Sequence, residues 1–287
     1  MKVINTMQVI KKVDELRATL GKYRKAGKRI GLVPTMGYFH EGHLSLIDAV
    51  LEKTDIVVVS LFVNPTQFGP SEDLENYPRD FERDERLARE RGADIIFYPD
   101  VKEMYPEPFF TYVVTDQLSK VLCGKSRPVH FRGVTTIVAK LFNIVQPDVA
   151  VFGRKDAQQA IIIQRMVKDL NFPIEIIVAP IVREPDGLAM SSRNVYLSEK
   201  EWKQAPVIHA ALQKAFETVQ NGETSAEKIK RLIRQKIESA GLARIDYIEL
   251  IRERDLQSVD RVEPGTFVAV AVWFGKTRLI DNLALFI

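Results

Sequence analysis

The sequence contains little cysteine and little histidine. Its 287 residues include one cysteine, Cys123, and four histidines. A lone cysteine excludes an internal disulfide and is typical of a protein in a reducing compartment. So few cysteines and histidines also argue against a structural zinc site built from them. We therefore expect a cytoplasmic protein.

Long apolar runs are missing as well. The longest, Ile56 to Val63 and Phe267 to Phe274, fall well short of the roughly 18 residues that a helix needs to span a bilayer. The first residues also lack the unbroken apolar stretch of a signal peptide. Both apolar runs indicate buried strands, and we expect no membrane partner.

An excess of one charge is the third missing feature. Lysine and arginine together number 41 against 38 for aspartate and glutamate, a net charge of +3. Proteins that coat nucleic acid usually gather basic residues on one face, so we expect no nucleic-acid partner. A content of 46% hydrophobic and 28% charged residues is ordinary for a globular chain, and 287 residues are enough for two domains.

The rest of the chain is organised around Pro34 to Ile47, PTMGYFHEGHLSLI. Lys28 to Val33 before it has the pattern of a buried strand, and apolar residues at helical spacing follow from His43. The junction is thus a strand, a turn and a helix N-terminus, whose N–H groups and dipole favour an anion. Gly37 and Gly42 let a phosphate approach the backbone closely.

His40 and His43 are three residues apart, on one side of the first helical turn. Two imidazole donors at this place would bind phosphate oxygens. Taken alone, either histidine is more commonly a helix cap or a surface group. A zinc-protease motif is excluded because it needs histidines four residues apart.

Strands and helices alternate around this junction. Apolar residues on both alternations of Ile56 to Val63 are typical of a parallel strand covered on both faces. The whole pattern predicts βαβ units in a Rossmann-like sheet. The other expected elements are helices over Val9 to Lys25 and Phe81 to Arg91, the second with a solvated charged face, and strands at Ile95 to Tyr98, Val149 to Phe152 and Ile174 to Val178.

Polar segments follow several of these strands. Asn64 and Gln67 lie in NPTQFGP after a strand, where open α/β sheets bind ligands. Ordinary turn chemistry is the alternative. The basic segment Cys123 to Arg132, CGKSRPVHFR, is expected to form a loop that either closes over phosphates or is simply exposed.

Gly153 to Gln159, GRKDAQQ, forms a second strand-to-helix junction. Here Lys155 offers a mobile charge to phosphate, Asp156 an acceptor to a ribose hydroxyl, and Gln159 an amide to a hydroxyl or carboxylate. Helix capping is the alternative for the Lys-Asp pair.

LAMSSRN, at Leu188 to Asn194, supplies Ser191, Ser192 and Arg193. Two hydroxyls and a fork-shaped cation suit a polyphosphate, although a serine-rich loop is commonly only a loop.

A second domain is expected from about residue 183. Ser198 to Glu201 fits a capping box. The fold class is therefore α/β, with a Rossmann-like parallel-sheet domain over residues 1–182 and a smaller α+β domain over residues 183–287. The later elements are helices to about Gln220 and from about Ser225 to Ala240, and antiparallel strands at Ile245 to Ile251, Thr266 to Phe274 and Arg278 to Leu285.

Five motifs now occur in a fixed order: PTMGYFHEGHLSL, FVNPTQFG, SRPVHFRGV, FGRKDAQQ and REPDGLAMSSRN. From about Lys28 to Leu197 they resemble the pantothenate synthetase family of pantoate–β-alanine ligases. HEGH alone also resembles the HxGH signature of the wider nucleotidyltransferase superfamily. The resemblance implies that pantoate attacks the α-phosphorus of ATP to give pantoyl adenylate, from which β-alanine then displaces AMP to form pantothenate.

The resemblance also implies residue roles. The catalytic set is His40, His43 and Lys155, with His40 as the family's proposed proton donor or acceptor. The substrate-binding set is Asn64, Gln67 and Gln159. The ATP-binding set is Pro34, Thr35, Met36, Gly37, His43, Gly153, Lys155, Asp156, Val182, Met190, Ser191, Ser192 and Arg193.

The same resemblance implies that Mg²⁺ accompanies ATP, that the enzyme is a homodimer and that the C-terminal domain is a lid. The chain departs from the family at Val129 and Arg154, where glycine and glutamate are common. These departures bear on loop dynamics more than on the reaction.

Two other functions stay open. A nucleotidyltransferase that leaves AMP or CMP on a phosphorylated substrate would share His40 and His43 but would not need paired glutamines for a hydroxy acid. A non-catalytic nucleotide- or RNA-binding protein would share the fold, although the near-neutral charge and the lack of an aromatic stacking pattern argue against RNA. A requirement for β-alanine, or a salt-sensitive affinity for RNA, distinguishes these functions.

Overall fold

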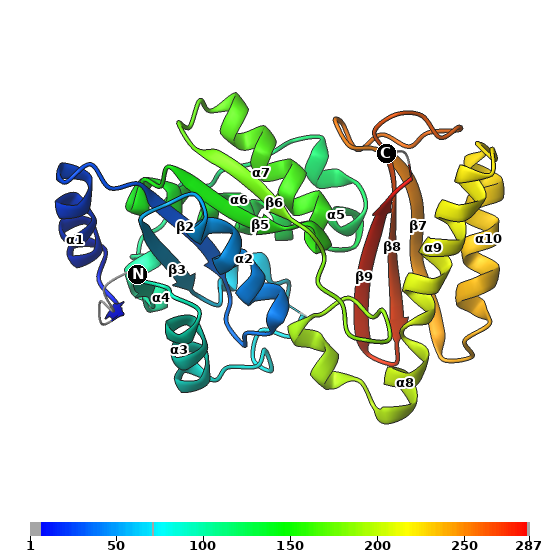
Figure 1. Ribbon diagram of the computed structural model, residues 1–287, viewed down its shortest axis with the longest axis horizontal. Helices are drawn as coiled ribbons and strands as arrows, with labels where there is room; N and C mark the ends of the chain where they lie inside the picture. Colours follow the sequence, from blue (N-terminus) through cyan, green and yellow to red (C-terminus); the bar gives the residue numbers. More distant parts are fainter. Residues whose placement is uncertain (1–6, 71, 286–287) are drawn as a thin grey trace. The chain divides into compact units, whose positions relative to one another are not determined.

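The computed structural model describes residues 7–70 and 72–285, and the chain divides into two compact units. The first comprises Met1–Arg154 and Ile162–Pro180, and the second comprises Lys155–Ile161 and Ile181–Ile287. Each unit is built on a sheet of its own (Figure 1).

The first unit contains a six-stranded parallel sheet with the order β1-β4-β3-β2-β5-β6. Strands β2, β3 and β5 are apolar on both alternations because both faces of the central sheet are buried. The predicted Rossmann-like fold class is confirmed. The strands are β1 (Gln8–Ile10), β2 (Ile30–Thr35), β3 (Ile56–Leu61), β4 (Ile95–Phe97), β5 (Val149–Gly153) and β6 (Glu175–Ala179).

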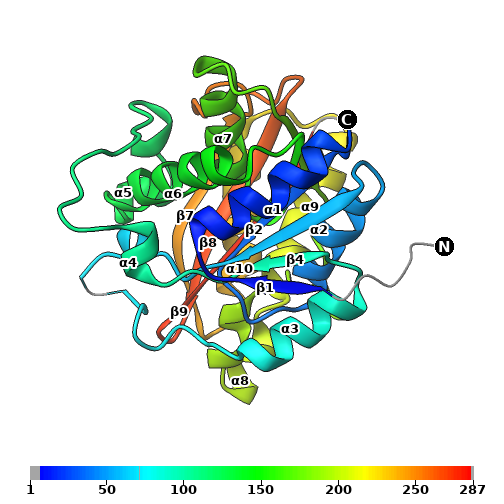
Figure 2. The ribbon, with the colours of Figure 1, turned by 90° about the vertical axis from the view of Figure 1, so that its left-hand side faces the viewer.

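Helices pack on both faces of this sheet. On one face, α2 and α3 bury Leu44, Ile47 and Ala88 against the sheet residues Val33 and Val57. On the other, α1 and α6 lie side by side (Figure 2). The helices are α1 (Val13–Lys25), α2 (Glu41–Leu51), α3 (Phe81–Glu90), α4 (Val101–Met104), α5 (Cys123–Ser126), α6 (His130–Val145) and α7 (Ala157–Asp169), whose residues up to Ile161 belong to the second unit.

A short edge strand precedes the first helix. The sequence pattern predicted a helix from Val9, but Gln8–Ile10 pair in parallel with Ile95–Phe97 and the helix begins at Val13. The predicted helix start is wrong because three residues are too few to separate a strand's alternation from one face of a helix.

Two aspartates fix the amino ends of neighbouring strands. Asp148, just before β5, accepts the backbone N–H of Ile30 in β2 at 2.7 Å. Asp94, just before β4, accepts the N–H of Val57 in β3 at 2.8 Å. The register of the sheet is therefore set at its amino edge, which leaves the carboxyl edge to the loops that carry the polar motifs.

The strand order reverses between β2 and β5. From β2 the chain passes to β3 on one side, and it later returns to β5 on the other. Open α/β sheets bind ligands outside the carboxyl ends of their strands at such a point. In this sheet those ends are Thr35 of β2 and Gly153 of β5, with Leu61 of β3 next to Thr35.

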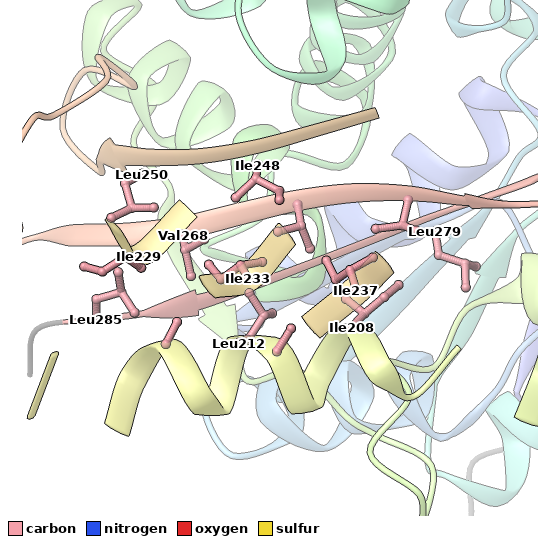
Figure 3. Packing of buried hydrophobic residues seen from close by; sticks show 14 of the residues in the cluster. Ile208, Leu212, Ile229, Ile233, Ile237, Ile248, Leu250, Val268, Leu279 and Leu285 are labelled. Atoms are coloured by element: carbon pink, nitrogen blue, oxygen red, sulfur yellow. The ribbon is translucent and has the colours of Figure 1, made fainter. Parts of the chain in front are cut away.

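The second unit contains a three-stranded antiparallel sheet with the order β7-β8-β9. Isoleucines four residues apart on α10 (Ile229, Ile233 and Ile237) pack with Leu212 of α9 against sheet residues such as Val268 (Figure 3). The predicted helices, strands and Ser198–Glu201 capping box are confirmed. The elements are α8 (Glu199–Gln204), α9 (Val207–Gln220), α10 (Ala226–Glu238), β7 (Ala243–Arg252), β8 (Thr266–Phe274) and β9 (Thr277–Ala284).

Length and hydropathy of the helices bear on membrane insertion. Across residues 7–70 and 72–285, no helix combines the length and the apolar character that crossing a bilayer requires.

Gly31 of β2 allows α2 to approach the sheet. A Cβ at this position would lie 2.3 Å from Val50 Cγ2 and 2.6 Å from Thr54 Oγ1. We expect Gly31→Ala to lower the free energy of unfolding in urea by about 1 to 3 kcal/mol, the usual effect of overpacking a core.

Gly21, in the interior of α1, is the matched control. Nothing lies within 4 Å of a Cβ built there. Gly21→Ala should raise the free energy of unfolding by about 0.5 to 1 kcal/mol, because alanine favours a helix over glycine. Equal effects of the same sign at both positions would contradict this account.

Candidate active site

The loops that follow β2 and β3 contact each other at the carboxyl edge of the sheet. The backbone N–H of Phe62 donates to the Thr35 carbonyl at 3.0 Å, and the Thr35 hydroxyl donates to the Ser60 carbonyl at 2.8 Å. Gln67 Nε2 donates to Met36 Sδ at 3.0 Å. The motifs PTMGYFHEGHLSL and FVNPTQFG, which are separate in the sequence, are therefore joined by hydrogen bonds at this edge of the sheet.

A buried carboxylate holds the turn between β2 and α2. Asp84 of α3 is 1% exposed, and its two oxygens accept the backbone N–H groups of Tyr38 at 2.6 Å and Phe39 at 2.7 Å. Gly37 has φ 85°, and a Cβ there would lie 2.9 Å from Asp84 Oδ2. Burial raises the pKa of Asp84, against the effect of the two donors. The turn thus depends on one glycine and one carboxyl group.

The side chains of His40 and His43 accept hydrogen bonds from backbone N–H groups at the start of α2, in an arrangement called a capping box. Nδ1 of His40 accepts the N–H of Gly42 at 3.1 Å, and Nδ1 of His43 accepts the N–H of His40 at 3.4 Å. A ring nitrogen that accepts carries no hydrogen, so each neutral ring carries its proton on Nε2. The cap and the phosphate donor are therefore compatible roles for the same side chain.

The two imidazoles lie next to each other, with ring centroids 4.1 Å apart. They stand at a helix N-terminus, where the partial positive charge of the backbone favours anions. Two Nε2–H donors at such a place are suited to the oxygens of a phosphate group.

Asn64 lies between Gln67 and the core. It is 1% exposed, and its Nδ2 donates to Gln67 Oε1 and to the Gly133 carbonyl, each at 3.1 Å. Its Oδ1 accepts the hydroxyl of Tyr105 at 2.8 Å. The Asn64 amide is thus bonded within the protein, and it orients the Gln67 amide.

Tyr105 is buried at the end of α4. Burial raises the pKa of Tyr105 to about 12, so its hydroxyl keeps its hydrogen at neutral pH. Its ring packs edge-on against Phe109 at 5.0 Å between centroids.

The basic segment Cys123–Arg132 is not the loop that the sequence suggested. Cys123–Ser126 form α5, and His130 begins α6. The predicted loop is wrong because most of its residues belong to α5 or to the start of α6, with one short turn between the two helices. Val129 has φ −92°, which any residue adopts, so the valine in place of the family's usual glycine is not strained.

Two residues of this segment brace the backbone of Gln67. Arg127 donates to Glu72 Oε2 from Nε at 2.9 Å and to His130 Nε2 at 3.2 Å. Because His130 Nε2 accepts, its Nδ1 carries the hydrogen and donates to the Gln67 carbonyl at 3.0 Å. A Cβ on Gly133 would lie 2.5 Å from Gln67 N, which shows how closely α6 approaches this turn.

In the second unit, β9 contacts both remaining motifs. Asn282 Nδ2 donates to the Lys155 carbonyl at 3.1 Å, and Lys155 Nζ lies 3.5 Å from Asp156 Oδ2. β9 also packs against the 3₁₀ helix Ser192–Tyr196. Lys155 and the serine motif therefore both contact β9 within this unit. Gln159 is half-buried on the first turn of α7.

A short hairpin leads into the serine motif. Met190 donates its N–H to the Val182 carbonyl at 3.0 Å, and the Ser191 hydroxyl accepts the N–H of Arg193 at 3.3 Å. At the start of the hairpin, Arg183 forms a two-pronged ion pair with Asp281 of β9, at 2.6 and 3.0 Å. The hairpin is thus anchored to the sheet.

The sequence analysis missed Asp84, Tyr105 and Asn282. Asp84 lies in the charged helix α3 and Asn282 in a strand, and no local motif marks any of the three. Only their contacts with distant motifs identify them.

Within the described ranges, no group of three or more His, Cys, Asp or Glu side chains is arranged to hold a metal ion.

The family model described as pantoate-beta-alanine ligase matches residues 8–284. Pantothenate synthetase from Acetivibrio thermocellus is 55% identical over 277 residues, 96% of this chain and 99% of that protein. Pantothenate synthetase from Thermotoga petrophila is 54% identical over 285 residues, 99% of this chain and 100% of that protein.

Solved structures agree. The crystal structure of pantothenate synthetase from Thermus thermophilus is similar with a TM-score of 0.93 and 44% identity, over 98% of this chain and 100% of that one. The pantoate-beta-alanine ligase from Francisella tularensis, complexed with beta-gamma ATP and beta-alanine, is similar with a TM-score of 0.80 and 33% identity, over 98% of both chains.

Asp84→Asn should loosen the turn before α2. An asparagine has one acceptor oxygen for two N–H groups and directs its own NH₂ at the other. We expect hydrogen exchange at the Tyr38 and Phe39 amides, followed by NMR, to accelerate about ten- to a hundredfold, the equivalent of a lost buried acceptor.

The control is Asp80→Asn on the same helix. Asp80 caps α3 by accepting the N–H of Arg83 at 3.1 Å. Asparagine caps a helix about as well as aspartate, so exchange at Tyr38 and Phe39 should stay unchanged. Slow exchange in both variants would overturn the role given to Asp84.

Proposed function

Because the chain belongs to the pantoate-beta-alanine ligase family, we infer that it is a pantothenate synthetase, which joins (R)-pantoate to β-alanine with ATP. The observation that carries this inference is the pairing of an imidazole-capped helix N-terminus with the fixed amide of Gln67 at adjacent strand ends. The first suits the phosphates of a nucleotide, and the second suits the oxygens of a small hydroxy acid.

We propose that the reaction has two steps. A carboxylate oxygen of pantoate bonds to the α-phosphorus of ATP as the bond to the β-phosphate's bridging oxygen breaks, and pyrophosphate leaves. The amine of β-alanine then attacks the acyl carbon and loses a proton, while AMP leaves with the oxygen that came from pantoate. The adenylate is needed because a free carboxylate resists attack by an amine.

The nucleotide residues are assigned by the family resemblance, and the chemistry of the charged ones supports it. Negative charge builds on the α-phosphate and on the departing pyrophosphate, so catalysis rests on positioned donors and cations. His40 and His43 donate from Nε2, and Lys155 supplies a positive charge. The remaining ATP contacts are assigned to Pro34, Thr35, Met36, Gly37, Gly153, Asp156, Val182, Met190, Ser191, Ser192 and Arg193.

Pantoate is assigned to Gln67 and Gln159. The NH₂ group of Gln67 points at a thioether, which is a weak acceptor. A carboxylate or hydroxyl oxygen of pantoate replaces that contact at little cost. Asn64 is assigned to orient Gln67 rather than to contact pantoate, because its own amide is bonded within the protein.

Mg²⁺ enters with ATP, as its complex with the phosphate oxygens. The site residues are mostly donors and cations, which suit phosphates rather than a bare cation, so no step is assigned to a metal held by the protein.

The enzyme is further proposed to be a cytoplasmic homodimer. Phe110 and Val114 are 83% and 63% exposed, and covering apolar side chains of this kind would favour association with a second copy. Sedimentation equilibrium tests the proposed dimer, and a mass of one chain at micromolar concentration would contradict it.

The proposed reaction is tested with (R)-pantoate labelled with ¹⁸O in its carboxylate. With ATP and Mg²⁺ the enzyme should release pyrophosphate, and after β-alanine is added one ¹⁸O should appear in AMP. Unlabelled AMP would exclude the adenylate. A stable nucleotidyl product with no need for β-alanine would indicate a simple nucleotidyltransferase.

His43→Ala and Lys155→Ala should each slow the pantoate-dependent release of pyrophosphate about a hundred- to a thousandfold, since one lost transition-state donor costs roughly 3 to 4 kcal/mol. Rapid-quench measurement of the first turnover isolates this step. Lys168→Ala, at an exposed position in the last turn of α7, is the control and should be unaffected. Near-normal first turnover in either site variant would remove its assigned role.

A further inference from the structure

We propose that Tyr105 is a positioning residue for pantoate, which sets the orientation of the Gln67 amide through Asn64. The inference rests on the proposed function, because Gln67 is the group that contacts pantoate. It concerns a buried tyrosine that no motif marks and that lies 38 positions after Gln67 in the chain.

The first step is the orientation of the Asn64 amide. Its Oδ1 accepts the Tyr105 hydroxyl at 2.8 Å and the Thr66 hydroxyl at 3.0 Å. Donors on this side hold the oxygen there, so the NH₂ group of Asn64 faces the opposite way. Both of its hydrogens are used, toward Gln67 Oε1 and the Gly133 carbonyl, each at 3.1 Å.

The second step passes this orientation to Gln67. Because Asn64 donates to Gln67 Oε1, the oxygen of Gln67 faces the core and its NH₂ group faces Met36 Sδ at 3.0 Å. A carboxylate or hydroxyl oxygen of pantoate meets a donor there. If the Asn64 amide were reversed, Gln67 would reverse with it and would present its carbonyl oxygen to the carboxylate, which is repulsive.

Tyr105 is the donor best placed to prevent this reversal. The Thr66 hydroxyl lies 3.0 Å from Asn64 Oδ1 and 3.1 Å from the Tyr105 hydroxyl, and its single hydrogen serves one of them at a time. When it donates to the Tyr105 oxygen, the tyrosine's own hydrogen stays directed at Asn64 Oδ1, where the Thr66 backbone N–H at 3.4 Å gives weaker support. Thr66 also belongs to the turn Pro65–Gln67 that it would have to hold. Tyr105 lies outside the turn, is 8% exposed and has its ring packed against Phe109.

Tyr105→Phe removes this donor and keeps the ring. We expect the KM for pantoate to rise about tenfold, the effect of one lost hydrogen bond near 1.4 kcal/mol, while the KM for ATP changes less than about twofold. Tyr98→Phe is the matched control, since Tyr98 is a partly buried tyrosine stacked on Phe81 at 4.3 Å. It should leave both constants unchanged.

A double-mutant cycle separates positioning from a general structural effect. In a Gln67→Ala background there is no amide left to orient, so adding Tyr105→Phe should change pantoate kcat/KM by less than about twofold. The same loss in both backgrounds, or equal rises of the pantoate and ATP constants, would overturn the proposal.

The proposed function is judged separately in the unmodified enzyme. Absence of pantoate-dependent pyrophosphate there would refute the function itself. An active enzyme whose Tyr105→Phe variant matches it in pantoate KM would refute only the role of Tyr105.

Discussion

The amides at the start of α2 constrain the chemistry of this protein more than any other feature. Backbone N–H groups in the first turn of a helix need acceptors, and here two imidazoles supply them. Accepting through Nδ1 puts the hydrogen of each ring on Nε2. The cap of the helix and the proposed donation to phosphate are thus compatible in one arrangement, and the turn that leads into it is held by the buried carboxylate of Asp84.

Much of the fold could be predicted because it follows from local patterns. Continuous apolar runs predict β3 and β8, and the four-residue spacing of Ile229, Ile233 and Ile237 predicts α10. β1 was not predicted because three residues are too few to show the alternation of apolar and polar residues that is typical of a strand. The basic segment around Arg127 was predicted to be a loop, either closing over phosphates or exposed, because the sequence did not show that Glu72, 55 residues earlier, binds that guanidinium.

The residues of the candidate site likewise fall into those that the sequence predicts and those that only the structure identifies. Motifs at the two strand-to-helix junctions point to His40, His43 and Lys155 from sequence alone. The residues that hold these motifs in place could not be predicted from the sequence. Asp84 binds Phe39 across 45 positions of the chain, and Tyr105 binds Asn64 across 41. Asn64 itself was expected at the substrate, and its full set of internal bonds gives it the part of orienting Gln67. Contacts made by folding, rather than by neighbouring sequence, complete the site.

The bond between Asn64 and Gln67 also bears on inhibitor design. Since the oxygen of Gln67 is engaged from behind, a small molecule that reaches this point should present a carboxylate, a sulfonyl oxygen or a carbonyl. An amine or amidine placed there would face the hydrogens of an NH₂ group beside a thioether sulfur, and it would lose its own hydration without a strong acceptor in return. Compound libraries for this site are thus best biased toward acceptors.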